Sequence, residues 1–560
     1  MRNRRRKKDA ESPLRIIPIG GLNEIGKNMT VFEYKEEMII VDCGLSFPDD
    51  EMFGIDIVIP DFTYVIKNAN RIKGIFLTHG HEDHIGAIPY LLKSISAPIY
   101  GTRLTLGLIE NKLKEHNING KLRTIRAGEQ IKVGCFELET IRMTHSIADA
   151  LCYAIETPAG RIFHTGDFKI DYTPVDGEPI DFNRLAELGA KGVTLMLADS
   201  TNATRPGYTA SEKQVGTTLQ NIFMNSKARI IIATFSSNVH RVQKIIDNVA
   251  LCGRKVALSG RSMINVTNLA TELGYIKLPA NMLVDINKIK RIPDHELVII
   301  TTGSQGEPMS ALSRMATSDH KAVQIKKGDM VILASTPVPG NEKTVSNVVN
   351  RLAAKGAEVL YSDIADIHVS GHACQEELKL IHSLIRPKFF MPVHGEHRHL
   401  KQHALLAESL GMPSENICIL DNGDALTITG DRVTITKEEV SAEPIMVDGL
   451  GIGDVGNIVL RDRKMLSEAG LIIVVAAIEK ESGTIYSGPD IVSRGFVYVR
   501  ENEDLIEEAR NVVSKTLAKC RKEKIRDWNA VRAAVRDALR SFIYEKTQRS
   551  PVILPIFLEV

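Results

Sequence analysis

Three of the sixteen histidines fall in one short segment, His79-Gly-His-Glu-Asp-His84. Histidine nitrogens and carboxylate oxygens are ligands that zinc and similar divalent cations accept, at about 2.0 to 2.2 Å. His79 and His81 form one pair of ligands, and Asp83 and His84 form a second. One cation could not easily take all four side chains, so the segment predicts two adjacent metal ions. The segment follows an apolar strand, and packing gives no reason for such a cluster there.

Two metal ions need more ligands than this segment offers. Three other strand-end turns supply candidates, namely His145, Asp167 and His394. Taken singly, each is more often a hydrogen-bonded turn residue. Taken together with the histidine segment, they favour a shared metal centre.

The elements that must position these residues are short apolar runs, each followed by a polar turn and then a helix-like segment. Such runs are typical of buried strands in α/β layers, and ligand sites in open α/β sheets lie at the carboxyl ends of the strands. The runs are Ile75–Leu77, Arg161–Thr165, Val193–Leu197, Ile230–Phe235, Leu297–Thr302 and Phe389–Val393. We therefore expect an α/β protein with its chemistry at strand ends.

The chain of 560 residues is too long for one hydrophobic core, because such cores stop growing at about 250 to 300 residues. Turn chemistry at Arg205–Gly207 and a glycine-rich stretch around 440–450 suggest boundaries. Beyond the second boundary, strands are expected at 471–478 and 551–558, and helices at about 502–521 and 527–545. The last part should form a small α+β domain.

Bulk properties predict a cytoplasmic protein with no membrane segment. Hydrophobic content of 43% and charged content of 25% are typical of soluble domains, and no run approaches the roughly 18 apolar residues of a membrane helix. Met1–Lys8 holds six Lys or Arg with no apolar stretch behind it, unlike a secretory signal. This basic arm is either a solvated tail or a contact for nucleic acid. The seven scattered cysteines fit reduced thiols. The net charge of +1 gives no information about partners, because a nucleic-acid groove depends on where the charges lie.

More than 200 residues separate Asp167 from His394, and an α/β insertion at about 209–365 occupies most of that gap. The insertion should roof the metal centre and leave a cleft that suits a threaded polymer. Three of its turns are rich in residues that bind phosphate at helix amino termini, although ordinary caps have the same composition. These turns are Phe235–Asn238, Thr302–Pro308 and Ser335–Gly340, of which the first offers Ser237 and Asn238 as phosphate contacts.

A further polar turn, His368-Val369-Ser370-Gly371-His372, lies just before the His394 segment. His372 could protonate a leaving oxygen or steady the attacked phosphate, and Ser370 and Gly371 could donate to phosphate oxygens. As isolated residues they would more often be satisfied polar groups. Their position in the chain favours a role in substrate binding for the whole turn.

The pattern His79-x-His81-x-Asp83-His84 resembles the signature of the metallo-β-lactamase superfamily, and the insertion resembles that of its β-CASP nucleases. Within that group the sequence of this chain is similar to the ribonuclease J family of bacteria. The matching stretches are Gly20–Lys27, Thr78–Gly86, Thr301–Met309, His368–His372 and Ile452–Arg461. The resemblance runs from near residue 15 to the carboxyl terminus.

The resemblance assigns a role to each candidate. It implies His79, His81, His145 and Asp167 around one metal ion, and Asp83, His84, Asp167 and His394 around the second. It also implies Asp199, His372 and His394 as the motifs linked to the insertion, with Asp83, Asp199 and His372 catalytic. Asp42 matches a carboxylate that supports the metal loop, or is a strand-end turn residue.

The fold implied is a metallo-β-lactamase αββα sandwich interrupted by an α/β β-CASP domain, with a small α+β domain at the end. We expect the first part of the sandwich at 1–208, with a basic tail at 1–12, and the β-CASP domain at 209–365. The second part of the sandwich should occupy 366–440, a linker 441–449, and a C-terminal oligomerisation domain 450–560.

The function implied is a metal-dependent ribonuclease with 5′-to-3′ exonuclease and endonuclease activity on single-stranded RNA, acting in rRNA processing, other RNA maturation and mRNA decay. Our mechanistic hypothesis is an in-line attack on phosphorus by water held between two divalent cations, with Zn²⁺ preferred and Mn²⁺ an alternative. The expected partners are RNA and a second copy in a homodimer or homotetramer, or a paralogue in a hetero-oligomer, and an RNA-degradation complex.

Three rival functions remain open at this point. A DNA-processing β-CASP enzyme would share the metals and lobes, although the family contrast implies that His394 favours RNA. A small-molecule hydrolase, such as a thioesterase or lactonase, uses the same loop without so large an insertion. A scaffold subunit of an RNA-degradation assembly would be expected to lose metal ligands, and none is lost here.

Overall fold

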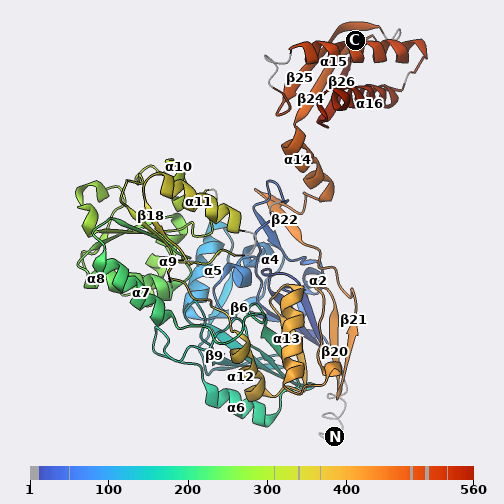
Figure 1. The fold of residues 1–560 in the computed structure, drawn as a ribbon. Helices are drawn as coiled ribbons and strands as arrows, with labels where there is room; N and C mark the ends of the chain where they lie inside the picture. The colour runs from blue at the N-terminus through green and yellow to red at the C-terminus, as the bar shows by residue number, and fades with distance from the viewer. Residues whose placement is uncertain are drawn as a thin grey trace. The chain divides into compact units, whose positions relative to one another are not determined.

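The structure is a computed structural model that describes residues 12–49, 51–307, 309–338, 341–362, 364–365, 367–479, 484–497, 503–525 and 527–560. The chain forms two compact units (Figure 1). The large unit comprises Met1–Phe47 and Ile57–Ile445, and the small unit comprises Pro48–Asp56 and Met446–Val560. Apart from Ser12, the predicted basic tail lies outside the described residues, as do Pro308, Pro339 and Gly340 of the predicted phosphate-binding turns.

Two sheets pack face to face in the large unit. The first has the strand order β21-β20-β1-β2-β3-β5-β6-β7, and the second has the order β19-β12-β11-β10-β9-β8. The strands of the first are β1 (Leu14–Gly20), β2 (Met29–Tyr34), β3 (Glu37–Val41), β5 (Ile72–Phe76), β6 (Pro98–Gly101), β7 (Lys121–Thr124), β20 (Ala425–Thr429) and β21 (Arg432–Thr436). Those of the second are β8 (Gln130–Val133), β9 (Phe136–Arg142), β10 (Leu151–Thr157), β11 (Gly160–His164), β12 (Leu195–Asp199) and β19 (Phe389–Val393).

Strand β10 shows why these strands are almost wholly apolar. Tyr153 and Ile155 point into the core between the two sheets, where they meet residues of the first sheet such as Phe76. Cys152 and Ala154 point to the opposite face, into a core formed with the helices α6 (Phe182–Lys191), α12 (Gln375–Ile385) and α13 (His397–Ser409). A strand covered on both faces must be hydrophobic at consecutive positions.

The insertion is built on a parallel sheet of its own, with the order β15-β14-β16-β13-β17-β18. Ile230 and Ile232 pack against α7, α8 and α9, whereas Ile231 and Ala233 face α10 and α11 on the other side. The strands are β13 (Ile230–Ala233), β14 (Lys255–Ser259), β15 (Leu283–Val284), β16 (Leu297–Thr301), β17 (Met330–Leu333) and β18 (Glu358–Leu360). The helices are α7 (Glu212–Asn225), α8 (Val239–Leu251), α9 (Arg261–Glu272), α10 (Ala311–Thr317) and α11 (Glu342–Ala354).

The insertion and the β-sandwich share a hydrophobic core. Helix α5 (Arg103–Glu115) of the sandwich contacts α9, and Leu104, Ile147 and Ala148 belong to the same apolar cluster as the residues of α7 to α9. In Figure 1 the green and yellow elements of the insertion lie beside the blue and teal ones of the sandwich. The shared core therefore fixes the position of the insertion over the strand ends.

The chemistry-bearing residues follow strands whose carboxyl ends meet. His79 follows β5, Asp167 follows β11, Asp199 ends β12 and His394 follows β19. Strands β11, β12 and β19 are parallel neighbours, so their carboxyl ends lie at one edge of the second sheet. The remaining short elements of the large unit are α2 (Thr63–Lys67), α3 (Glu82–Ile85), α4 (Ile88–Leu92) and β4 (Ile57–Ile59).

The small unit carries a three-stranded sheet, β25-β24-β26, with two helices on one face. The sequence predicted its central strand at 471–478, and β24 spans Leu471–Ile478. The other elements are α15 (Glu503–Lys522), α16 (Trp528–Thr547), β25 (Ile485–Arg494), β26 (Val552–Glu559) and the preceding α14 (Asn457–Ala469), β22 (Ile445–Asp448) and β23 (Gly451–Ile452). The sequence did not predict that 48–56 would join this unit, where the Asp56 N–H donates to the Val447 carbonyl at 2.9 Å.

Candidate metal centre

Asp42 anchors the histidine loop. One oxygen of its carboxylate accepts the Thr78 backbone N–H at 2.8 Å, and the other accepts the Thr78 hydroxyl at 2.8 Å. The same second oxygen lies 2.8 Å from Nδ1 of His84. Because the carboxylate can only accept from that ring, the contact places the proton on Nδ1 and leaves Nε2 of His84 to face the centre.

The first cluster joins His79 and His81 to His145. Nδ1 of His81 lies 3.0 Å from Nε2 of His79 and 3.1 Å from Nε2 of His145. Asp167 lies beside them, with its Oδ2 atom 3.8 Å from His79 Nε2 and 4.0 Å from His145 Nε2. The structure thus brings together the four residues that the resemblance implies for one metal ion.

The second cluster lies on the other side of Asp167. Oδ2 of Asp167 is 3.1 Å from His84 Nε2, and Oδ2 of Asp83 is 3.6 Å from the same nitrogen. His394 completes the group, with Nε2 3.2 Å from Asp83 Oδ2 and Nδ1 3.5 Å from Asp167 Oδ1. A separation of His394 from His84 and Asp83 would have ruled out a common centre.

His372 and Asp199 form a third group against these clusters. Nδ1 of His372 lies 2.8 Å from Asp199 Oδ2 and 3.9 Å from Asp167 Oδ2. Asp199 also lies 3.3 Å from His394 Nδ1. The ligand atoms of these residues lie within 4.8 Å of one another.

The electrostatics suit divalent cations. Burial and neighbouring imidazoles hold the pKa of His79 well below its usual value, and burial lowers the pKa of His81 to about 4. Both rings are therefore neutral near pH 7, which is the form that binds metal. Burial opposes ionisation of the carboxyls, yet the surrounding imidazoles, His84 and His394 first among them, hold the pKa of Asp83 and of Asp167 below the usual range. Although burial opposes protonation of His84 and His394, the neighbouring carboxylates raise the pKa of His84 well above its usual value and that of His394 to about 10, so these two rings must release a proton when metal binds. Imidazoles and ionised carboxylates packed this closely fit a pair of divalent metal ions.

Comparison with known proteins identifies the architecture. Family models match 22–197 ("Metallo-beta-lactamase superfamily"), 227–352 ("Ribonuclease J, beta-CASP domain"), 356–418 ("Zn-dependent metallo-hydrolase RNA specificity domain") and 458–560 ("Ribonuclease J C-terminal domain"). The chain is 45% identical to "Ribonuclease J2" of Bacillus subtilis over 99% of this chain and 100% of that one. It is 45% identical to "Ribonuclease J 1" of Streptococcus pyogenes over 97% of each.

The chain belongs to the ribonuclease J family. Its fold is the predicted metallo-β-lactamase domain with an inserted β-CASP domain and a C-terminal domain. One solved structure, of a protein of unknown function from Enterococcus faecalis, is similar in fold, with a TM-score of 0.53 and 17% sequence identity. The match covers 74% of this chain and all of the solved one. No helix among the described residues is long and apolar enough to cross a membrane.

In this ribonuclease J family member, the turn 368–372 reaches the metal centre through its backbone. The Gly371 carbonyl accepts from Nδ1 of His145 at 2.7 Å, and a Cβ on Gly371 would lie 2.6 Å from Cε1 of that ring. Only glycine therefore fits this position. The Ser370 hydroxyl accepts from Nδ2 of Asn202 at 2.8 Å, and its own O–H stays a candidate donor for phosphate.

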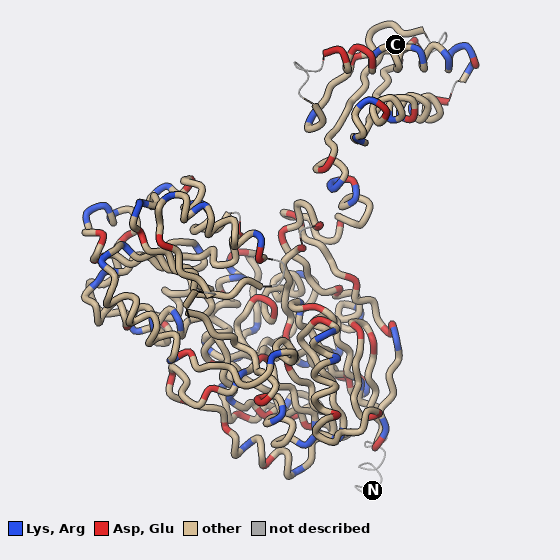
Figure 2. The backbone as a smooth tube through the Cα atoms, viewed as in Figure 1, with Lys and Arg blue, Asp and Glu red and all other residues tan. Residues whose placement is uncertain are grey.

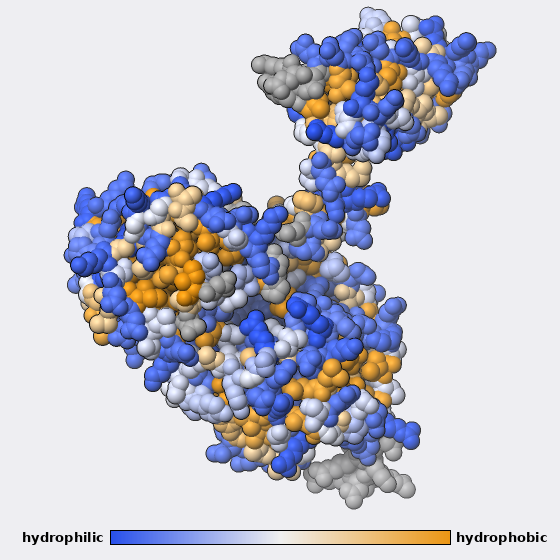
Figure 3. All heavy atoms as spheres, viewed as in Figure 1, coloured by the Kyte–Doolittle hydropathy of each residue, from blue (hydrophilic) through white to orange (hydrophobic). Residues whose placement is uncertain are grey.

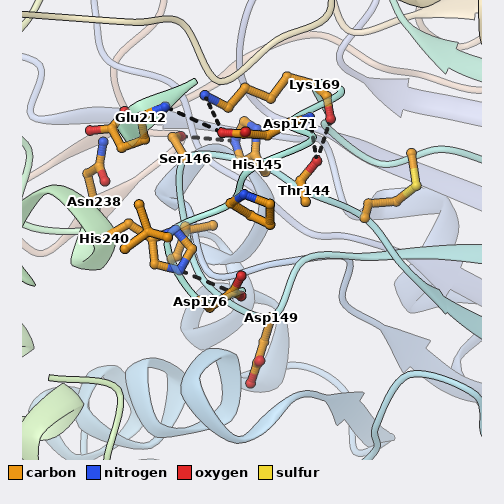
Figure 4. Close-up of a pocket in the computed structure, with 14 residues that line it drawn as sticks. Thr144, His145, Ser146, Asp149, Lys169, Asp171, Asp176, Glu212, Asn238 and His240 are labelled. Carbon is orange, nitrogen blue, oxygen red and sulfur yellow. Dashed lines mark hydrogen bonds and ion pairs between the residues drawn. The ribbon is translucent and has the colours of Figure 1, made fainter. Parts of the chain in front are cut away.

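Asn238, which the sequence predicts as a phosphate contact, caps α8 with its amide oxygen, which accepts the Arg241 backbone N–H at 3.0 Å. It also lines a pocket beside His145, which Figure 4 shows. Ser146, Lys169 and His240 belong to the same pocket wall. Ser237 precedes this cap and is half-buried. The pocket is formed jointly by the β-sandwich and the insertion.

The sequence analysis missed two residues of the centre. Asn28 follows directly on the matching stretch Gly20–Lys27, and its Nδ2 lies 3.1 Å from the Asp83 carbonyl and 3.2 Å from His84 Nε2. Thr201 lies two residues after Asp199, and its hydroxyl is 2.8 Å from Asp199 Oδ1 and 2.7 Å from His394 Nδ1. Because the hydroxyl donates to the carboxylate, it accepts from the ring, and Nε2 of His394 faces the second cluster.

Replacing Thr201 by Val should weaken metal binding about tenfold to a hundredfold, because a ligand histidine that loses its outer hydrogen bond loses its fixed orientation. Thr201→Ser keeps the hydroxyl and should bind metal like the wild type. Isothermal titration calorimetry of the metal-free proteins with Zn²⁺ measures the affinity of each variant. Equal affinities for the Val and Ser variants would contradict this role of Thr201.

Proposed function

We propose that this metal-dependent ribonuclease hydrolyses single-stranded RNA as a 5′-to-3′ exonuclease and as an endonuclease, in RNA maturation and mRNA decay, with two divalent metal ions per chain. The observation that carries the proposal is the pair of ligand clusters that share Asp167 beneath the insertion. Zn²⁺ is the proposed ion, supported by the match of 356–418 to a family of Zn-dependent metallo-hydrolase domains.

The chain's own residues set up an in-line displacement at phosphorus. When bound, two divalent cations would lower the pKa of a water molecule and neutralise charge on the phosphate. Asp83 and Asp167 line the space between the clusters, where their carboxylates accept hydrogen bonds from the attacking water and orient it. His372, held by Asp199 at 2.8 Å, lies beside Asp167 and contacts the scissile phosphate. Orientation of this kind converts a bimolecular encounter into a positioned attack.

We expect RNA binding to depend on local hydrogen-bond donors rather than on a positive electrostatic field of the whole protein. The net charge is +1, and Figure 2 shows Lys and Arg interspersed with Asp and Glu along the described chain. The donors of the turn 368–372 and of the pocket beside His145 supply local contacts for phosphate. We therefore assign phosphate binding to Ser237, Asn238 and 368–372, with His372 nearest the metal centre.

Metal-dependent digestion of end-labelled RNA and DNA in parallel tests the function. With Zn²⁺ or Mn²⁺ the protein should degrade the RNA and leave the DNA largely intact, and a chelator should stop the reaction. Asp83→Ala and His81→Ala should each abolish cleavage, with a melting temperature near that of the wild-type protein without metal. Full activity of either variant, or equal digestion of the two polymers, would refute the assignment.

We also propose that the exonuclease prefers RNA with a 5′ monophosphate, as the family resemblance implies. Three RNAs of one sequence that bear a 5′ monophosphate, triphosphate or hydroxyl test this preference. Charge-assisted hydrogen bonds to a terminal phosphate should make the exonuclease about tenfold to a hundredfold faster on the monophosphate than on the hydroxyl RNA. A circular RNA of the same sequence, which has no end, reports endonucleolytic cleavage alone. Equal exonuclease rates on all three linear RNAs would remove the end-sensing proposal.

We also propose that the small unit associates with a second copy of the chain. Its sheet is covered by α15 and α16 on one face, and the other face exposes Leu554, Ile556 and Leu558 of β26. Figure 3 shows hydrophobic side chains gathered on the visible side of this unit. Exposed apolar surface of this kind favours a protein interface.

Leu554→Glu and Leu558→Glu together should lower the mass in solution measured by light scattering, because two buried carboxylates would oppose the interface. Leu251→Glu, at the end of α8 in the large unit, is the matched control, since Leu251 is also exposed. An unchanged oligomer in the β26 variant would place the interface elsewhere.

A further inference from the structure

Arg241 is the largest fully buried side chain among the described residues, and it is 0% exposed. Its Nε and Nη2 atoms donate to the two carboxylate oxygens of Glu212 at 2.6 and 2.9 Å. Nη1 donates to the Ala334 carbonyl at 2.5 Å and lies 2.9 Å from Nδ1 of His368, and Nη2 donates to the Val369 carbonyl at 3.5 Å. Each N–H of the guanidinium therefore has an acceptor, and one of these acceptors is the ring of His368.

This contact decides the tautomer of His368. An arginine has only donors, so Nδ1 of His368 accepts and its single proton lies on Nε2. Burial, followed by the charges of Arg241 and Lys169, lowers the pKa of His368 to about 3. The ring is therefore neutral near pH 7 and presents one N–H group on the side away from Arg241.

We propose that Arg241 is a positioning residue that holds His368 as a neutral Nε2–H donor to a phosphate oxygen of RNA. The proposal rests on the proposed function, in which the turn 368–372 binds phosphate. A phosphate oxygen accepts hydrogen bonds only, so a ring whose Nε2 always carries the proton is always ready to bind it. Arg241 cannot touch the RNA itself, because Glu212 neutralises it and no part of it is exposed.

The competing explanation is that Arg241 and Glu212 are a buried ion pair of the fold and nothing more. The insertion offers a matched control in Arg229, which is also buried, donates to Asp329 with Nε at 3.0 Å and donates to the Gln324 carbonyl at 2.7 Å. The hydrogen bonds described for the Arg229 guanidinium include no histidine. Arg229→Lys therefore disturbs a similar buried pair in the same domain without changing the contact to His368.

Exonuclease kinetics of the metal-loaded full-length chain on 5′-monophosphate RNA separate the two explanations. His368→Ala should raise KM about tenfold to a hundredfold, the effect of removing a hydrogen bond to a charged group. Arg241→Lys should raise KM by a similar factor and add nothing in the His368→Ala background, because both changes remove one contact. Arg229→Lys should leave KM near the wild-type value in either background. Effects of Arg241→Lys and His368→Ala that multiply in the double variant would overturn the proposal.

A spectroscopic measurement on the wild-type chain keeps the proposal testable even if Arg241→Lys fails to fold. Nitrogen NMR of histidine-labelled protein, with His368 assigned from the spectrum of His368→Ala, should show Nδ1 bare and Nε2 protonated at neutral pH. An Nδ1–H tautomer that donates to the Ala334 carbonyl would overturn the role of Arg241, even where His368→Ala raises KM. The expected tautomer with an unchanged KM in His368→Ala would instead refute the phosphate contact assigned under the proposed function.

Discussion

The carboxylate of Asp167 is the interaction on which the site depends. Its Oδ2 atom lies 3.1 Å from His84, 3.8 Å from His79, 3.9 Å from His372 and 4.0 Å from His145. A buried carboxylate is costly unless it is paired, and here the partners come from the loops after β5, β9 and β19 and from the turn 368–372. Both ligand clusters include this one group, so a shift of any loop disturbs both. The strand ends must consequently meet closely enough to keep all of these contacts.

The insertion does not disturb this arrangement because of where it leaves and rejoins the sandwich. The chain departs after β12 and returns to β19, and these strands are parallel neighbours with Asp199 paired to Val393. The hydrogen bonds between β12 and β19 therefore hold the two ends of the insertion close together. The shared apolar core at Leu104 and Ile147 holds its far side, and Arg241 then joins the start of α7, the end of β17 and the turn 368–372. The loops of the metal centre and the turn 368–372 are in this way fixed to one another.

The sequence predicted those parts of the site whose residues lie close together along the chain. His79, His81, Asp83 and His84 lie within six positions, and their ligand types suffice to predict metal ions. His145, Asp167 and His394 could be proposed as further ligands from their place at strand ends, but their division between two metal ions came only from the family resemblance, because nothing local shows which strand ends meet. Thr201, Asn28 and Arg241 have no such pattern. A threonine, an asparagine or an arginine acquires its role from a neighbour in space, and for Arg241 that neighbour is more than 100 positions away. Both ends of strand β24 were predicted correctly, because an apolar run between two turns is a local signal. The contact of Asp56 with Val447 could not be predicted, because these residues are far apart in the sequence.

At two strand ends of the site the backbone adopts a conformation that residues other than glycine rarely adopt. Asp42 and His394 both adopt the left-handed region, with φ of 61° and 54°. Such a conformation costs of order 1 to 3 kcal/mol at a residue other than glycine, although Asp and His tolerate it better than most. Glycine would relieve the strain at either position but would remove a carboxylate or an imidazole from the centre. The backbone is held there by hydrogen bonds from Asp42 N to the Phe76 carbonyl at 2.9 Å and from His394 N to the Gly21 carbonyl at 3.0 Å. Since β3 and β19 belong to different sheets, the same sharp turn at both strand ends directs side chains from the two layers of the sandwich into one space. The strain is therefore a consequence of building one centre from two sheets.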